Sequence, residues 1–220
     1  ARAGALVLEG DVSSDEGMDA AYEATIGRFG AVDALINNAA LLQNHLFPPS
    51  GRVNVLDTSD EDWEKMLRVN VLGTLKVIRR FVRPMIEQRR GSIVNFSTSG
   101  TVPQYFRPGS QEQPYMASKA AILSMSIYLA EELKDKNVAV NAVFPGHSEM
   151  TGWERVDRAR REMGLWTPTS RQVPEHIAPL ILFLAAHDTT NGPTGHFIHA
   201  DEWNVRHGAG TPASWLRENR

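Results

Sequence analysis

Short apolar runs alternate with longer stretches of helical periodicity along most of this chain. Between 60 and 88, for example, apolar residues recur every three or four positions, and a compact run rich in Ile and Val follows at 92–96. We expect strands at 5–8, 32–36, 92–96, 138–144 and 195–200, and helices at 13–29, 60–88, 115–134 and 174–186. This alternation predicts βαβ units, and therefore an α/β fold with a doubly wound parallel sheet and helices on both faces.

Composition excludes several classes of protein. The chain has 220 residues with 42% hydrophobic residues, which is enough for a core, so we expect one domain over 1–220. Its 23 basic and 26 acidic residues give no basic surface for nucleic acid. The longest apolar run, 177–186, is too short to cross a membrane. The absence of cysteine excludes disulfides, and the first residues lack the pattern of a signal peptide, so we expect a cytoplasmic protein.

Polar or turn-forming residues follow several of the expected strands. They are Asp11, Asn37, Asn38, the hydroxyl residues at 97–99, and the turn Pro145–Gly146. The carboxyl ends of parallel strands meet at one edge of a sheet, where such folds bind ligands. The sequence therefore predicts a ligand site at this edge.

Tyr115 and Lys119 are four residues apart on an expected helix, so both side chains lie on one helix face. A free tyrosine has a pKa near ~10, and a neighbouring ammonium group lowers that pKa. Such a tyrosine can exchange a proton with an alcohol or carbonyl oxygen. The alternative interpretation is a packing tyrosine beside a surface lysine, since the spacing also occurs by chance.

Six motifs in the correct order extend over almost the whole chain. They are Asp11–Val12, Asn-Asn-Ala-Ala at 37–40, Asn70, Gly-Ser-Ile-Val-Asn-Phe-Ser-Thr at 91–98, Tyr-x-x-x-Lys at 115–119, and Asn-x-x-x-Pro-Gly at 141–146. Together they resemble the short-chain dehydrogenase/reductase family. The resemblance implies a Rossmann-like fold and an oxidoreductase that transfers a hydride between NAD or NADP and an alcohol or ketone.

The resemblance also implies roles for single residues. Tyr115 would give or take the proton at the substrate oxygen, and Lys119 would hold the ribose hydroxyls of the cofactor and lower the pKa of Tyr115. Asn70 would fix a water molecule in a proton relay. No metal is required. The choice between NAD and NADP cannot be read from this sequence, and family members imply a homodimer or a homotetramer.

Eleven residues are the expected cofactor contacts. They are Asp11, Val12, Asn38, Ala39, Ala40, Tyr115, Lys119, Pro145, Gly146, Ser148 and Thr151. Asp11 could instead cap the helix after it, and Asn38 could be a turn residue bonded to its own backbone. Two positions depart from the family pattern: Ala40 stands where a glycine is usual, and Met150 takes the place of a threonine, so that Thr151 follows one position later.

Three adjacent hydroxyl residues compete for the role of hydrogen-bond donor to the substrate oxygen. Counting along the strand from Gly91 favours Thr98, with Ser99 second and Ser97 third. Strand register is the stricter criterion, because a shift of one residue turns a side chain to the other face.

Two loops and the tail are expected to set specificity and assembly. The loops 101–114 and 147–173 carry Tyr105, Phe106, Arg107, Trp153, Leu165 and Trp166, together with an arginine run at 155–161. These residues predict a bulky, ring-bearing or acidic substrate. We expect the tail at 201–220, with Trp203 and Trp215, to dock on a second copy of the chain.

Alternative functions remain open from the sequence. One is a catalytically silent nucleotide-binding or scaffold protein on the same fold. Others are an enoyl reductase, an epimerase or a dehydratase that uses the same residues. By comparison with the family pattern, the chain lacks a first strand, a Gly-rich loop, a helix and a second strand, so we expect roughly forty or more residues before Ala1 in the natural protein.

Overall fold

The computed structural model describes residues 4–105, 111–165, 167–168 and 170–219. Its centre is a parallel sheet of four strands in the order β1-β2-β3-β4. The strands are β1 (Ala34–Asn37), β2 (Gly91–Phe96), β3 (Val138–Phe144) and β4 (Phe197–His199). Each lies where the apolar runs predict a strand, and every connection between neighbours passes through helix, as a parallel sheet requires.

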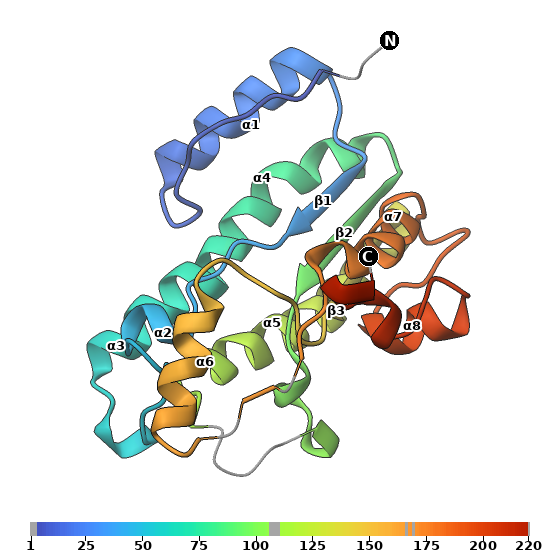
Figure 1. Ribbon diagram of the computed structural model, residues 1–220. Helices are drawn as coiled ribbons and strands as arrows, with labels where there is room; N and C mark the ends of the chain where they lie inside the picture. Colours follow the sequence, from blue (N-terminus) through green and yellow to red (C-terminus); the bar gives the residue numbers. More distant parts are fainter. Residues whose placement is uncertain (1–3, 106–110, 166, 169, 220) are drawn as a thin grey trace.

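Helices cover both faces of the sheet, which confirms the predicted α/β, Rossmann-like fold (Figure 1). Helices α4 (Thr74–Glu87) and α5 (Tyr115–Leu133) pack on one face, in a cluster that includes Ile93. Helices α7 (Ala178–Ala185) and α8 (Ala200–Arg206) pack on the other, in a cluster that includes Val94. Consecutive residues of β2 thus point to opposite layers, as strand geometry dictates.

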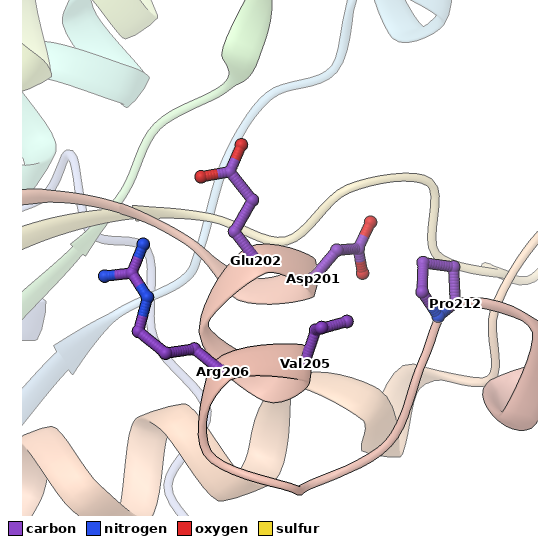
Figure 2. A pocket seen from close by; sticks show the side chains of 5 residues that line it. All are labelled: Asp201, Glu202, Val205, Arg206 and Pro212. Carbon is purple, nitrogen blue, oxygen red and sulfur yellow. The ribbon is translucent and has the colours of Figure 1, made fainter.

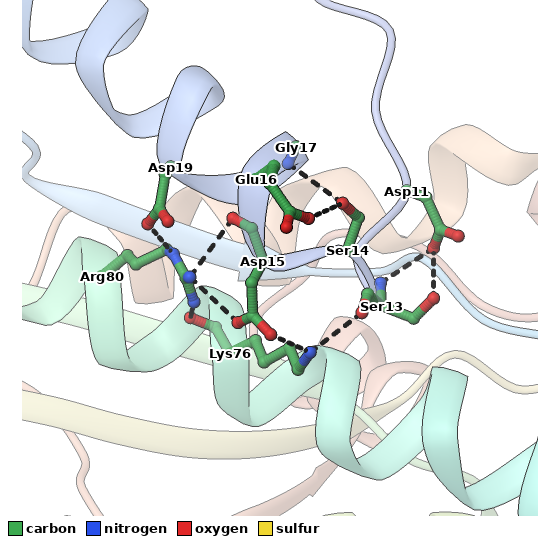
Figure 3. Close-up of polar contacts among 9 residues, drawn as sticks. All are labelled: Asp11, Ser13, Ser14, Asp15, Glu16, Gly17, Asp19, Lys76 and Arg80. Carbon is green, nitrogen blue, oxygen red and sulfur yellow. Dashed lines mark hydrogen bonds and ion pairs between the residues drawn. The ribbon is translucent and has the colours of Figure 1, made fainter.

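Helix α1 (Asp15–Phe29) lies outside this sandwich and packs against α4. The rings of Tyr22 and Phe81 meet edge to face with centroids 5.5 Å apart. Figure 3 shows the polar part of this contact: Lys76 pairs with Asp15 at 2.6 Å, and Arg80 reaches the carboxylates of both Asp15 and Asp19. These ion pairs are largely exposed, so they orient α1 more than they stabilise the fold.

The strand expected at 5–8 is wrong. These residues are extended but exposed, with Val7 at 88% exposure, and they run back along α1, where Gly4 approaches Arg28 and Gly10 approaches Met18 (Figure 1). An apolar run becomes a strand only where a neighbouring strand pairs with its backbone groups. Within the described part of the chain, no strand lies beside 5–8.

The long helix expected over 60–88 is present, but it is not regular throughout. Helix α3 (Asp60–Leu67) passes into a π-helical segment, Arg68–Gly73, before α4 begins. The apolar periodicity continues through the wider turn, so the pattern of apolar residues does not predict the π segment. Short π-helical segments of this kind occur mostly inside α-helices and often at functional sites.

The tail makes contacts with the rest of its own chain. Trp215 is only 8% exposed, and its backbone oxygen accepts a hydrogen bond from Val173 at 2.8 Å. The ring of Trp203 stacks on His207 with centroids 4.2 Å apart. Intrachain contacts thus cover Trp215, while docking of the tail on a second copy stays a prediction. Among the described residues, no helix is long and apolar enough to cross a membrane.

Candidate active site

A cavity of about 710 Å³ opens at the carboxyl ends of β1, β2 and β3. Its polar lining residues include Asn38, Ser97, Tyr115, Lys119 and Arg155. Its apolar lining comprises Ala39, Ala40, Leu42, Pro48, Pro49, Phe96, Pro145, Met150, Gly152, Trp153 and Val156. The predicted ligand site at this edge of the sheet is thus a real concavity, with a mostly apolar wall and a few polar groups, as small-molecule sites generally have.

Tyr115 and Lys119 both border this cavity from the first two turns of α5. The Lys119 Nζ atom lies 5.8 Å from the centroid of the Tyr115 ring, so the two side chains share one face of the helix as predicted. Lys119 is 5% exposed, and its ammonium group donates to the Phe96 carbonyl at 2.8 Å. A buried cation and a phenol therefore face the same space.

Burial controls the proton affinity of both groups. It raises the pKa of Tyr115 above its ordinary value, and the nearby carboxylate of Glu112 acts in the same direction. Burial also lowers the pKa of Lys119 to about 8. The sequence predicted that Lys119 would lower the pKa of Tyr115, and this direction is corrected: desolvation of the phenol is the larger effect, so Tyr115 is protonated at neutral pH.

Asn70 lies behind Tyr115 in the π-helical segment and is 1% exposed. Its Oδ1 atom accepts from the Leu41 backbone N–H at 2.7 Å. Its Nδ2 atom donates to the Leu41 carbonyl and to the Ser118 hydroxyl, each at 3.0 Å. Asn70 thus connects the loop after β1 to α5 from within the π segment.

The three hydroxyl candidates separate at the end of β2. Ser97 borders the cavity, but its hydroxyl donates to the Lys119 carbonyl at 2.9 Å. Thr98 is half-buried at the N-cap of the short 3₁₀ turn Ser99–Thr101, and both Thr98 and Ser99 lie just beyond the cavity lining of the described structure.

The predicted cofactor contacts divide by position. Five of them besides Tyr115 and Lys119 line the cavity: Asn38, Ala39, Ala40, Pro145 and Thr151. Gly146 stands behind Pro145 with a φ of 78°, where an added Cβ would meet the Asp201 carboxylate at 2.9 Å. Ser148 forms a parallel bridge with Gln172, away from the lining.

Asp11 and Val12 are not among the described residues that line the cavity. One oxygen of Asp11 accepts from both the backbone N–H and the hydroxyl of Ser13, each at 2.8 Å (Figure 3). These bonds lower the pKa of Asp11. Val12 packs toward Gly73, where an added Cβ would lie 2.9 Å from its side chain. The N-cap of α1 is Ser14, whose hydroxyl accepts from the Gly17 N–H, so Asp11 forms a turn just before the helix and does not cap it.

Helix α6 (Trp153–Glu162) forms one wall of the cavity within the predicted substrate loop. Two guanidinium groups lie over the Trp153 ring, with Arg171 4.3 Å and Arg160 5.1 Å from its centroid. Arg160 is buried, donates to the Ser50 carbonyl at 2.7 Å and pairs with Glu112 at 3.2 Å. The arginine run therefore includes a residue that fixes α6 in place. Phe106, Arg107 and Trp166 lie outside the described residues.

Sequence reasoning missed the second wall of the cavity. Leu42, Asn44, His45, Pro48 and Pro49 line it, from helix α2 (Gln43–Leu46) and the loop around it. This segment follows the motif at 37–40 directly, and that proximity was the one signal that could have marked it. Gln43, between them, is buried and was also missed.

A second hollow, of about 430 Å³, lies on α8 (Figure 2). Asp201, Glu202, Val205, Arg206 and Pro212 line it, and none of these belongs to the predicted site. The cavity at the strand ends, which gathers Tyr115 and Lys119, is therefore the candidate active site.

Comparisons with known proteins show the family of this chain. A family model described as enoyl-(acyl carrier protein) reductase matches residues 1–202. The chain belongs to the short-chain dehydrogenase/reductase family. It is 46% identical over 217 residues to fluoren-9-ol dehydrogenase from Terrabacter sp. (strain DBF63), covering 96% of this chain and 60% of that protein.

More distant relatives of this short-chain dehydrogenase/reductase carry other names. The 3-oxoacyl-[acyl-carrier-protein] reductase FabG of Thermotoga maritima is 36% identical over 181 residues, which are 81% of this chain and 68% of that protein. Galactitol 2-dehydrogenase of Rhizobium johnstonii is 34% identical over 200 residues, which are 89% of this chain and 74% of that protein. A solved structure from Bacillus thuringiensis, described provisionally as a 3-oxoacyl-reductase, superposes with a TM-score of 0.68 at 23% identity and shares the fold. That alignment covers 87% of this chain and 73% of the other.

The donor set of the cavity fits the nicotinamide end of NAD or NADP. The ammonium of Lys119 and the hydroxyl of Tyr115 suit ribose hydroxyls, and the small side chains of Ala39 and Ala40 leave room beside them. The positive φ of Gly146 turns the chain sharply behind the Pro145 wall. The residues present therefore suit such a cofactor.

Proposed function

We propose that this protein is an NAD- or NADP-dependent oxidoreductase that interconverts a bulky secondary alcohol and its ketone. The observation that carries the proposal is that Tyr115 and Lys119 border one cavity at the carboxyl ends of the strands. A bound nicotinamide cofactor supplies or accepts the hydride. The chain's own residues then bind, orient and exchange the proton.

Tyr115 is the proposed proton donor in ketone reduction. Because burial raises the pKa of this phenol, it carries its proton at neutral pH and can give that proton to the carbonyl oxygen. The proposed second donor to this oxygen is Thr98, since the Ser97 hydroxyl is already used on the Lys119 carbonyl. Alcohol oxidation needs the deprotonated phenol, so we expect it to be favoured as pH rises.

The proposed substrate class follows from the lining and from the relatives. Phe96, Met150, Trp153 and Val156 offer apolar and aromatic surface, which favours a flat hydrophobic ring system. The 46% identity to fluoren-9-ol dehydrogenase supports fluoren-9-ol and its ketone as the first pair to assay. We propose the 147–173 region as the substrate loop because α6 forms a wall of this cavity.

A second candidate is reduction of a carbon–carbon double bond in a carrier-bound enoyl thioester. The description of the matching family model supports it. The apolar wall suits an acyl chain as well as a ring system, so the assay must include both substrate types.

The test is turnover by the natural chain that carries this sequence, with NAD and with NADP. Fluoren-9-ol, a 3-oxoacyl thioester, a 2-enoyl thioester and galactitol form the substrate panel. We expect the fluorenol to be oxidised, and Tyr115→Phe to lose turnover while still binding cofactor. Cofactor binding without turnover of any substrate would favour a silent nucleotide-binding protein instead.

Assembly and location complete the proposal. Family resemblance supports a homodimer or homotetramer, which light scattering of the natural chain would decide. The absence of cysteine suits work in the reducing cytoplasm.

A further inference from the structure

We infer that Gln43 is a positioning residue, which holds the backbone of Tyr115 and joins it to the segment around α2 that lines the cavity. The inference rests on the proposed function, because it assigns to Gln43 the placing of the residue proposed as proton donor. Gln43 begins α2 and comes from a segment 72 residues away from Tyr115 along the chain.

The contacts of Gln43 define its role. The side chain is 4% exposed, and its Oε1 atom accepts from the Tyr115 backbone N–H at 3.1 Å. Its Nε2 atom donates to the Gln113 carbonyl at 2.5 Å. A backbone N–H can only donate and a carbonyl can only accept, so these two partners fix the orientation of the amide. Gln43 thus binds the backbone of Gln113 and of Tyr115, on either side of Pro114.

Tyr115 needs such a partner because it is the first residue of α5. The first N–H groups of a helix have no acceptor within the helix. The N-cap residue is Pro114, whose ring cannot accept a hydrogen bond. Gln113 supplies one acceptor to the Ala117 N–H at 3.1 Å, and Gln43 supplies the other to Tyr115. A residue distant in sequence therefore caps this helix.

The carbonyl side of Tyr115 is held by the same segment of the chain. The Ser118 hydroxyl donates to the Tyr115 carbonyl at 2.7 Å and accepts from the Asn70 amide at 3.0 Å. Asn70 in turn binds both backbone groups of Leu41. The Tyr115 N–H is thus bonded to Gln43, and the Tyr115 carbonyl is connected to Leu41 through Ser118 and Asn70. Leu42, between these two positions, lines the cavity. Hydrogen bonds therefore connect the cavity wall at 41–43 to the backbone that carries the Tyr115 phenol.

The test compares two substitutions at one position. Gln43→Met keeps the volume but removes both hydrogen bonds, and we expect kcat to fall on the order of 100-fold with little change in KM, as for a misplaced catalytic group. Gln43→Glu loses the donor only while the carboxyl is ionised, because a protonated carboxyl offers one donor and one acceptor. Its kcat relative to wild type should therefore recover as pH falls, whereas that of Gln43→Met should not.

Gln88→Met provides the matched control. Its Nε2 atom donates to the Val32 and Arg90 carbonyls at 2.9 and 2.8 Å, far from the cavity, so the same kind of amide is lost. We expect this variant to keep the wild-type kcat and pH profile. If Gln88→Met loses kcat as Gln43→Met does, a general loss of rigidity explains both and the inference is overturned.

A second measurement does not depend on activity. Hydrogen exchange should show a protected Tyr115 amide in the wild type and in Gln88→Met, and a rapidly exchanging one in Gln43→Met. Wild-type kcat or an unchanged Tyr115 amide in Gln43→Met overturns the inference. If the wild type turns over no substrate, the proposed function fails, while amide exchange still decides whether Gln43 holds Tyr115.

Discussion

The ammonium group of Lys119 donates a hydrogen bond to the backbone carbonyl of Phe96 at 2.8 Å, which fixes a buried cation at the carboxyl end of β2. The side chain of Lys119 is 5% exposed, so water solvates it poorly, and burial lowers its pKa to about 8. The folded protein therefore holds the Lys119 ammonium charge at neutral pH in a poorly solvated position, and buried charges with shifted pKa values are typical of functional sites.

Lys119→Met should stabilise the fold at pH 7. The pKa of Lys119 falls from 10.5 to about 8 on folding, a penalty on the order of 3 kcal/mol for the protonated group. Loss of the hydrogen bond to Phe96 offsets part of this, so we expect a net gain of about 1 to 2 kcal/mol. Chemical denaturation measures it, with the exposed Lys65→Met as control.

The same lysine makes stability depend on pH. Between pH 8 and 10.5 the unfolded chain binds more protons than the folded one, so the free energy of unfolding of the wild type should rise over that range. The Lys119→Met variant should lack this rise. Parallel curves for the two proteins would contradict a lowered pKa.

Three single substitutions distinguish the hydroxyl groups after β2. Thr98→Val should lower kcat on the order of 100-fold, the usual effect of removing one donor to a developing oxyanion. Ser99→Ala should leave kcat near wild type. Ser97→Ala should cost about 1 kcal/mol of stability, because the Lys119 carbonyl loses its donor. Steady-state kinetics and thermal unfolding measure both quantities, and a large loss of kcat in Ser99→Ala alone would reassign the role.

Gly146→Ala should destabilise the fold by about 1 to 3 kcal/mol. Its φ of 78° is unfavourable for any residue with a Cβ, and the added atom would approach the Asp201 carboxylate to 2.9 Å. Gly27→Ala is the matched control. Gly27 lies inside α1 with free space around it, so alanine there should stabilise by about 0.5 to 1 kcal/mol. Shifts of the denaturation midpoint in opposite directions for the two variants would confirm both predictions.

Arg160→Met should loosen α6. Arg160 is buried, pairs with Glu112 and donates to Ser50, so we expect a loss of about 2 kcal/mol. Arg158, exposed on the same helix, provides the control, and Arg158→Met should change stability by less than about 0.5 kcal/mol. Hydrogen exchange should locate the loosening in α6, and equal effects of the two substitutions would contradict the assigned contacts.

Local sequence was sufficient where local chemistry decides the structure. The buried runs at 92–96 and 138–144 form strands because most residues there are apolar, as a sheet covered on both faces requires, while the amides of the buried Asn95 and Asn141 are hydrogen-bonded. The four-residue spacing of Tyr115 and Lys119 placed both on one side of α5, and Asn38, Ser97 and Pro145 met at one edge of the sheet, whereas Asp11 did not. These features follow from periodicity alone.

What the sequence could not show depends on distant partners. The run at 5–8 has strand-like residues, but a strand exists only with a neighbour to pair with. The direction of the Tyr115 pKa depends on how much protein covers the phenol, which spacing does not reveal. Gln43 lies in no motif, and its importance appears only when the fold brings it to the start of α5.

The π-helical turn at Arg68–Gly73 has a consequence for how this chain can change in length. Such a turn holds one residue more than a regular α-helix needs. Deleting one residue there would close 60–87 into an ordinary helix, with Ile78 and Met85 still against the sheet. The Asn70 amide, however, would no longer reach Leu41 and Ser118. We therefore expect a chain shortened at this point to keep the packing of its helices on the sheet and to lose the link that Asn70 makes between the loop after β1 and α5.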